Sequence, residues 1–193
     1  ATAAMLYVAV DRPADAGFLT VYPCGAAQPL ASNLNFVAGQ TVGNGVIAKI
    51  GDDGAVCVYS SAATDVVVDF TGAATAAGST TFHALVSGRV LDTREGGVAP
   101  GAGDVVRLDF TSLAAGTSVD LNLAVVDPQH GGFVTAYPCG TERPLAASLN
   151  YRRRQTKGNH LTVAIGAEKA VCLYTMSATH LVVDVDGVHV PTA

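Results

Sequence analysis

Charge, tryptophan and long apolar runs are all scarce in this chain of 193 residues. Only 14% of the residues are charged, which is about half the share in an average soluble protein. Tryptophan is absent, and no apolar run reaches the roughly 18 residues that a transmembrane helix needs, so we expect no membrane insertion. The formal net charge of −5 argues against nucleic acid as a partner, because phosphate contacts require a basic surface.

Sequence motifs for catalysis and metal binding are also missing. The chain has no Gly-x-Ser-x-Gly motif to present a nucleophile and no Cys-x-x-Cys motif for zinc. Its five histidines lack the spacing of metal ligands. We therefore expect no catalytic residue, no metal and no cofactor, and we interpret the protein as a non-enzyme.

Helical periodicity is absent too, and short strand-like runs take its place. No stretch of 11 residues repeats its apolar positions with a period of 3.6. The apolar share of 49% consists mostly of alanine and valine in short runs, which glycine, proline, aspartate and asparagine interrupt. This pattern is typical of β-strands, so the sequence predicts an all-β fold.

An internal duplication accounts for most of the chain. Residues 4–72 align without a gap with residues 119–187. Within them, 17–25 (GFLTVYPCG) matches 132–140 (GFVTAYPCG). Similarity of this length does not arise by chance, so the chain contains two copies of one folding unit.

Each copy carries two cysteines at the same spacing, Cys24 with Cys57 and Cys139 with Cys172. Four cysteines allow three pairings, and duplication favours one bridge inside each copy. A zinc site made by all four is the alternative, which the lack of a Cys-x-x-Cys motif disfavours. Disulfides persist in oxidising surroundings, so we predict a secreted or cell-surface protein.

Alternation and turn residues predict where the strands lie. In the second copy we expect strands at 118–126, 132–138, 161–165, 170–174 and 181–185. Short strands with closely spaced turns favour an antiparallel β-sandwich, immunoglobulin-like or jelly-roll-like, with one disulfide in each module. The predicted organisation is a first module at 1–72, a linker at 73–81 and a second module at 82–193.

The block 82–118 has no counterpart before residue 4. It contains strand-like sequence at 82–94 and 105–110, so the first module is expected to lack its opening strands and to expose a sheet edge. Three outcomes stay open: the module tolerates the loss, the block covers both copies, or a neighbouring chain supplies the strands and self-assembly follows. The chain begins Ala-Thr-Ala-Ala, so we expect any export signal to lie outside these residues.

Several strings together resemble a known repeat of secreted and cell-surface actinobacterial proteins. They are RVLDTR at 89–94, GFVTAYPCG at 132–140, SLNY at 148–151, AVCLY at 170–174 and THLVVDV at 179–185. The resemblance covers nearly all of 82–188 and, in part, 5–72. It implies a surface protein or a companion of a hydrolase, with no catalytic residues to transfer. The chain departs from the pattern at Asp65, where the family has histidine.

Two groups of charged residues are candidate sites. The first is Arg89, Asp92 and Arg94 within the RVLDTR string. An arginine beside an aspartate in a strand-then-turn segment indicates a structural ion pair, and recognition of a carboxylate or sugar is the alternative.

The second group is the chain's one basic cluster: Arg152, Arg153, Arg154, Lys157 and His160. The equivalent loop of the first copy reads Val-Ala-Gly, so the fold does not require the charge. The cluster fits an anionic surface polymer such as a teichoic acid or an acidic glycan. A merely solvated loop is the other interpretation.

These observations favour a non-enzymatic extracellular repeat protein with a surface, adhesive or structural role. Its partners would be other copies of itself, through strand complementation of the open first module. A glycan- or cell-wall-binding, lectin-like module is the first alternative. An accessory domain of a secreted hydrolase is the second.

Overall fold

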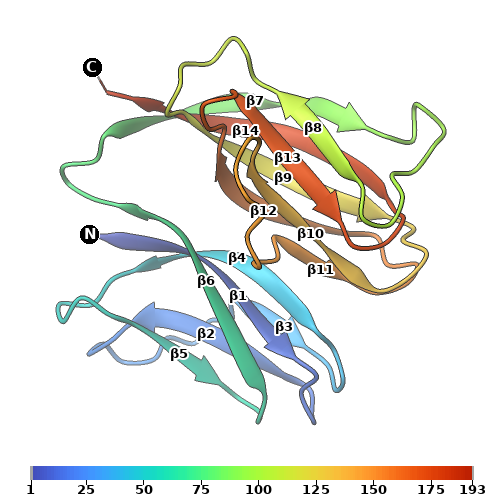
Figure 1. Cartoon of the computed structure of the whole chain (residues 1–193). Helices are drawn as coiled ribbons and strands as arrows, with labels where there is room; N and C mark the ends of the chain where they lie inside the picture. Colours follow the sequence, from blue (N-terminus) through green and yellow to red (C-terminus); the bar gives the residue numbers. More distant parts are fainter. Residues whose placement is uncertain (1, 193) are drawn as a thin grey trace. The chain divides into compact units, whose positions relative to one another are not determined.

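The structure, a computed structural model, describes residues 2–192 and divides the chain into two compact units (Figure 1). Module 1 is Ala1–Gly78 and module 2 is Ser79–Ala193. All regular structure in the described residues is β-strand, so the predicted all-β fold without helices is confirmed. No helix long and apolar enough to cross a membrane occurs in that range.

Module 1 is a sandwich of two three-stranded antiparallel sheets. One sheet has the order β4-β1-β6 and the other the order β3-β2-β5. The strand bounds are β1 Ala3–Asp11, β2 Gly17–Pro23, β3 Leu34–Phe36, β4 Val42–Lys49, β5 Val56–Ser60 and β6 Asp65–Ala74.

Module 2 repeats this arrangement and adds one strand to each sheet. Its sheets have the orders β12-β9-β14-β7 and β11-β10-β13-β8. The strand bounds are β7 Thr80–Asp92, β8 Val105–Asp109, β9 Ser118–Val126, β10 Gly132–Pro138, β11 Leu149–Tyr151, β12 Lys157–Ala164, β13 Ala170–Thr175 and β14 His180–Pro191. By the repeat, β9 to β14 correspond to β1 to β6, so β7 and β8 are the additional strands.

The core of each module lies between its two sheets. In β9, alternate apolar side chains point inward and are fully buried: Val119, Leu121, Leu123 and Val125. Successive side chains of a strand point to opposite faces, so this alternation alone defines the buried face. The core of module 1 follows the same rule with fewer residues.

One disulfide closes each module, as predicted. Cys24 pairs with Cys57, and Cys139 pairs with Cys172, each bond joining residues 33 positions apart. Both bridges link the loop after one strand to the strand beside it in the same sheet. Because all four cysteines are bonded, the alternative of a shared zinc site is excluded.

The predicted strands agree with the structure where alternation is regular and differ where it is not. The predictions 118–126 and 132–138 coincide with β9 and β10. The strand predicted at 161–165 begins earlier, at Lys157, and the strand predicted at 181–185 continues to Pro191. The three-residue strands β3 and β11 were not predicted. Residues 75–79 separate β6 from β7, whereas the predicted linker was 73–81.

Candidate functional site

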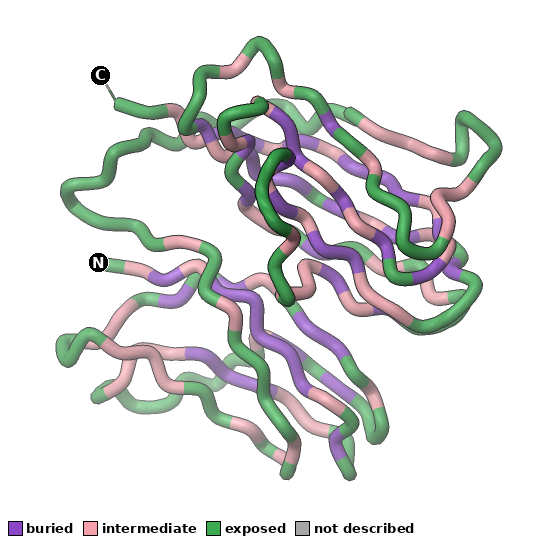
Figure 2. Tube along the Cα trace, viewed as in Figure 1, coloured by how far each residue is buried: buried purple, intermediate pink, exposed green. Residues whose placement is uncertain are grey.

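The last strand of module 1 forms an uncovered sheet edge. β6 is exposed along most of its length (Figure 2). Its core-facing side chains Val66, Val68 and Phe70 are 38%, 45% and 68% exposed. The equivalent residues of β14 are 0%, 0% and 9% exposed: Leu181, Val183 and Val185. The same positions are therefore core in one module and surface in the other.

A second open edge lies on the other sheet of module 1. Val58 on β5 is 38% exposed, whereas its equivalent on β13, Leu173, is fully buried. In module 2 the strand β8 pairs with β13 and contributes Leu108 to the core. Module 1 has no strand at this place in its described residues. Both sheets of module 1 thus end where module 2 has one strand more.

In module 2, β7 is attached to β14 by side chains as well as by the backbone ladder. The Arg89 Nε donates to Asp184 Oδ1 at 2.5 Å. Past the end of β7, the amide of Thr93 donates to the carbonyl of Leu181, whose own amide donates to Thr93 Oγ1. These contacts fix the position of β7 along β14 and do not depend on the core.

The ion pair predicted for the RVLDTR string lies at the end of β7. Asp92 accepts hydrogen bonds from Arg89 Nη1 at 2.8 Å and from Arg94 Nη2 at 2.5 Å. Its side chain is only 5% exposed. The Arg94 hydrogen bonds hold the pKa of Asp92 well below its usual range. The geometry is that of an internal connection between strand and turn, with Asp92 enclosed by its partners.

Module 1 retains the acceptor of this contact without its donor. Asp69 on β6 is the equivalent of Asp184, and no ion pair or side-chain hydrogen bond reaches it within the described part of the chain. Partial burial raises the pKa of Asp69, because desolvation disfavours the carboxylate. An arginine opposite Asp69 would remove that penalty.

A glycine makes room for β7 in module 2 and recurs in module 1. A Cβ on Gly187 would collide with the ring of Phe82, which belongs to β7. The equivalent residue is Gly72 on β6, where the nearest atom to such a Cβ is Met5 Sδ at 3.4 Å. The open edge therefore has space at the point where module 2 holds an aromatic ring.

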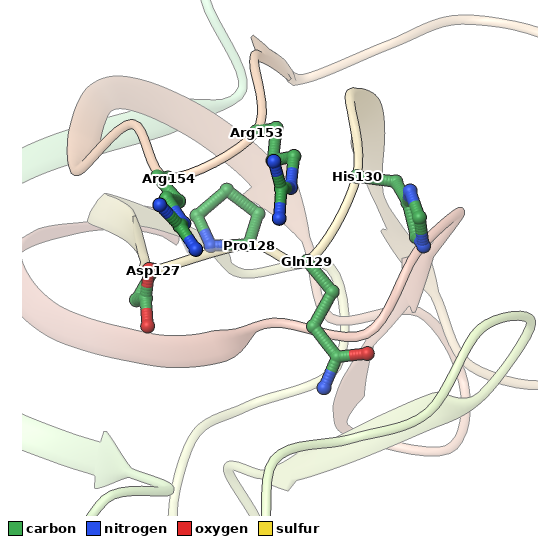
Figure 3. A pocket seen from close by; sticks show the side chains of 6 residues that line it. All are labelled: Asp127, Pro128, Gln129, His130, Arg153 and Arg154. Carbon is green, nitrogen blue, oxygen red and sulfur yellow. The ribbon is translucent and has the colours of Figure 1, made fainter.

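A basic pocket lies at the other candidate site, in module 2. It has a volume of about 370 Å³, and two loops line it (Figure 3). The loop between β11 and β12 provides Arg153 and Arg154, and the loop between β9 and β10 provides residues 127–130. The amide of Arg154 donates to the carbonyl of Pro128 at 2.8 Å, which holds the two loops together.

The backbone of Arg154 is in a conformation that favours glycine. Its φ is +59°, and its equivalent in module 1 is Gly39 with φ +68°. For a residue with a Cβ the left-handed conformation costs about 1–2 kcal/mol. The arginine thus occupies a strained position that the twin loop fills with glycine, and such strain is often found at functional sites.

Only two of the five predicted basic residues reach the pocket. Arg152 is engaged through its backbone, whose amide donates to Gln155 Oε1, and its side chain does not line the pocket. Lys157 and His160 lie on β12 and do not line it either. Burial lowers the pKa of Lys157 to about 8.

Sequence reasoning missed the opposite wall of the pocket: Asp127, Pro128, Gln129 and His130. These residues lie more than twenty positions from the arginines, so no local motif unites them. A signal was nevertheless present, because the repeat replaces Ala14 and Asp15 of module 1 by Gln129 and His130. The loops that changed together in the duplication are the loops that meet in space.

No cluster of three or more metal-binding side chains occurs within residues 2–192. Comparisons with protein-family models, with curated proteins and with solved structures give no match. The candidate functional sites of the described residues are the two open edges of module 1 and the basic pocket of module 2.

Proposed function

We propose that the protein is a non-enzymatic, extracellular structural protein that joins other polypeptides by β-strand addition to module 1. The observation that carries the proposal is the exposure of Val66, Val68 and Phe70, whose equivalents in module 2 are core residues. An apolar sheet edge left in water is a template for a further strand. Strand addition supplies main-chain hydrogen bonds and buries the exposed side chains together.

The extracellular location is supported by the disulfides. Two bridges in a chain with no free cysteine are compatible with an oxidising compartment. The resemblance of 82–188 to repeats of secreted actinobacterial proteins supports the same location. A structural role agrees with the low share of charged residues and with the duplication.

The test is strand binding to the intact protein. A panel of extended peptides with alternating apolar residues is titrated against it, and sedimentation velocity over a range of concentrations detects self-association. We expect 1:1 binding that Val68→Lys abolishes, because an inward-pointing charge blocks a sheet edge. Val67→Lys is the matched control, since Val67 belongs to the same strand but to its other face.

Binding of every peptide to Val68→Lys as to the unchanged protein would contradict the proposal. So would the absence of both peptide binding and self-association. Thermal unfolding of both variants establishes that module 1 remains folded during the measurement.

The basic pocket supports a second candidate function, the binding of an anionic glycan or cell-wall polymer. Arg153 and Arg154 line one wall, and arginine binds carboxylates and phosphates through paired hydrogen bonds. Module 1 has alanine and glycine at these positions, so the pair of arginines belongs to module 2 alone.

A glycerol-phosphate polymer and a sulfated oligosaccharide serve as probes for this candidate. We expect affinity that falls with salt concentration and falls about tenfold in Arg153→Ala. Arg152→Ala is the control, because that side chain lies outside the pocket. Equal loss in the two variants would assign the binding to general surface charge and not to the pocket.

A further inference from the structure

The open edge of β6 has the same shape as the covered edge of β14. Pairing of β9 with β14 skips Asp186, because Leu121 lies opposite Val185 and Asp120 opposite Gly187. Pairing of β1 with β6 skips the equivalent Thr71. A bulge bends its strand, so the two strands bend at the same place. A strand that fits β14 therefore meets the same backbone on β6.

The register of β7 on β14 can be transferred to this edge. In module 2, Arg89 lies opposite Asp184, and Gly88 lies opposite Val185. The equivalents on β6 are Asp69 and Phe70. A strand with the sequence of β7 thus places an arginine against Asp69, the acceptor that has no side-chain partner in the described residues. It also places the ring of its Phe82 over Gly72, where module 1 has space.

Exchange of β7 between two molecules of this protein does not complete module 1. Each chain offers two strands that accept β7, namely β6 and β14, and one strand β7 to give. Any exchange that fills β6 leaves β14 uncovered, so the number of open edges is unchanged. A second copy therefore gains no strand pairing by donating β7.

Pairing of β6 with β6 of a second molecule is opposed by charge. In an antiparallel pair centred on Val67, the valines at 66–68 of the two strands lie side by side. This register sets Asp65 of each strand opposite Asp69 of the other. Like charges directly opposite in a sheet are destabilising. The edge thus disfavours a copy of itself and favours a strand with a positive charge.

We infer that β6 binds, antiparallel and in the register of β7, a strand from outside residues 1–193 that carries an arginine opposite Asp69 and an aromatic residue over Gly72. The inference rests on the proposed function. The partner strand resembles β7 in sequence. A second strand equivalent to β8 covers β5 in the same way, where Asp53 stands in the place of Glu168, the acceptor of Arg107 in module 2.

A synthetic peptide of residues 80–94 is the probe, added to the intact 193-residue protein. We expect it to bind in a 1:1 ratio and to protect the amides of β6 from hydrogen exchange. Arg89→Ala in the peptide, or Asp69→Asn in the protein, should weaken binding about tenfold, as expected for a charge-assisted hydrogen bond. The reversed pair, Asp69→Arg with the Arg89→Asp peptide, should restore most of the affinity.

Gly72→Ala tests the aromatic contact without touching a charge. The added methyl group meets only the flexible Met5 in the free module, so folding is expected to be unchanged. Peptide binding should fall at least tenfold, because the methyl group takes the place of the ring. The Phe82→Ala peptide should bind Gly72→Ala and the unchanged protein equally.

Disulfide trapping tests the register independently of affinity. Phe70→Cys in the protein should cross-link to a peptide with Gly88→Cys, because directly opposite Cα atoms lie about 4.5–5.5 Å apart. A peptide with Ser87→Cys should react much less, because in module 2 the side chain of Ser87 contacts Asp186 and not Val185, the equivalent of Phe70.

The outcomes separate this inference from the proposed function. Binding to β6 that is indifferent to Asp69, Gly72 and Arg89 overturns the inference and leaves strand addition intact. Failure of peptide 80–94, with binding of other extended peptides blocked by Val68→Lys, does the same. Failure of every peptide together with absent self-association overturns both.

Discussion

Modules 1 and 2 contain nearly the same last strand, but they bury it to very different degrees. Both strands contain Val-Val-Asp, at 67–69 and at 182–184. Val68 is 45% exposed, and its equivalent Val183 is fully buried. The difference comes from β7 and β8, which place Leu91 and Leu108 in or against the core of module 2 and have no counterparts in module 1 among the described residues. Burial in a sheet edge is thus a property of the neighbouring strand and not of the strand's own sequence.

The loops show the opposite relation, in which the backbone is constant and the side chains change. The first residue after β1 and the first after β9 both have positive φ, +43° at Arg12 and +48° at Asp127. The loop that faces them carries Ala38 and Gly39 in module 1 and two arginines in module 2. The backbone conformation of these loops therefore does not depend on the arginines.

Removal of the disulfides is expected to have the largest effect on stability. The loss should have different consequences for the two modules. A closed loop of 33 residues stabilises a domain by about 4 kcal/mol in the chain-entropy model. Cys24→Ala with Cys57→Ala should unfold module 1 at 25 °C, because its core is small and open. Cys139→Ala with Cys172→Ala should leave module 2 folded with a lower Tm. Calorimetry and hydrogen exchange measure both. Equal loss in the two modules would show that β7 and β8 add little stability.

Val68 and Val183 are equivalent residues, so replacing each by alanine compares how much one position stabilises the two modules. Val183→Ala should destabilise module 2 by about 2 kcal/mol, because it leaves a cavity in a filled core. Val68→Ala should change module 1 by about 0.5 kcal/mol or less, as surface substitutions do. Denaturant unfolding measures both values. With peptide 80–94 bound, the loss of unfolding free energy caused by Val68→Ala should approach the loss caused by Val183→Ala. If the peptide leaves the effect of Val68→Ala unchanged, β6 stays uncovered.

The sequence alone predicted those features of the fold that follow from the internal repeat and from the alternation of apolar and polar residues. The duplication located both disulfides and the two β modules, and regular alternation gave the bounds of β9 and β10. It did not reveal β11, because three residues are too few to display alternation. The far end of β14 was missed because the skipped Asp186 interrupts the period of two. Of the residues that line the pocket, the sequence singled out Arg153 and Arg154 but not the loop that faces them, because the two loops are adjacent only after folding.

Lys157 offers a comparison that depends on pH. Its equivalent is Val42, a buried residue of module 1. Burial lowers the pKa of Lys157 to about 8, below the value of about 10.4 in an unfolded chain. The folded protein therefore releases this proton first, and the free energy of unfolding should rise between about pH 8 and pH 10.4.

Lys157→Val should remove that rise and stabilise module 2 at pH 7 by about 1 kcal/mol, because no charge is then buried. Unfolding by urea at pH 7 and pH 9.5, each compared with the unchanged protein, isolates the effect of this residue. A rise of equal size in the variant would assign the pH dependence to other groups.

The smallest effect concerns the strained arginine, and it links stability to recognition. Arg154→Gly should stabilise module 2 by about 0.5–1 kcal/mol, since relief of the left-handed strain exceeds the entropy that glycine loses on folding. Lys169→Gly is the control, because Lys169 also has positive φ, its equivalent is Gly54, and it lies outside the pocket. Both variants should gain similar stability, but only Arg154→Gly should lose affinity for the glycerol-phosphate polymer. A gain in stability without loss of affinity would mean that the pocket does not use this side chain, and a loss of stability would show that the arginine supports the loop itself.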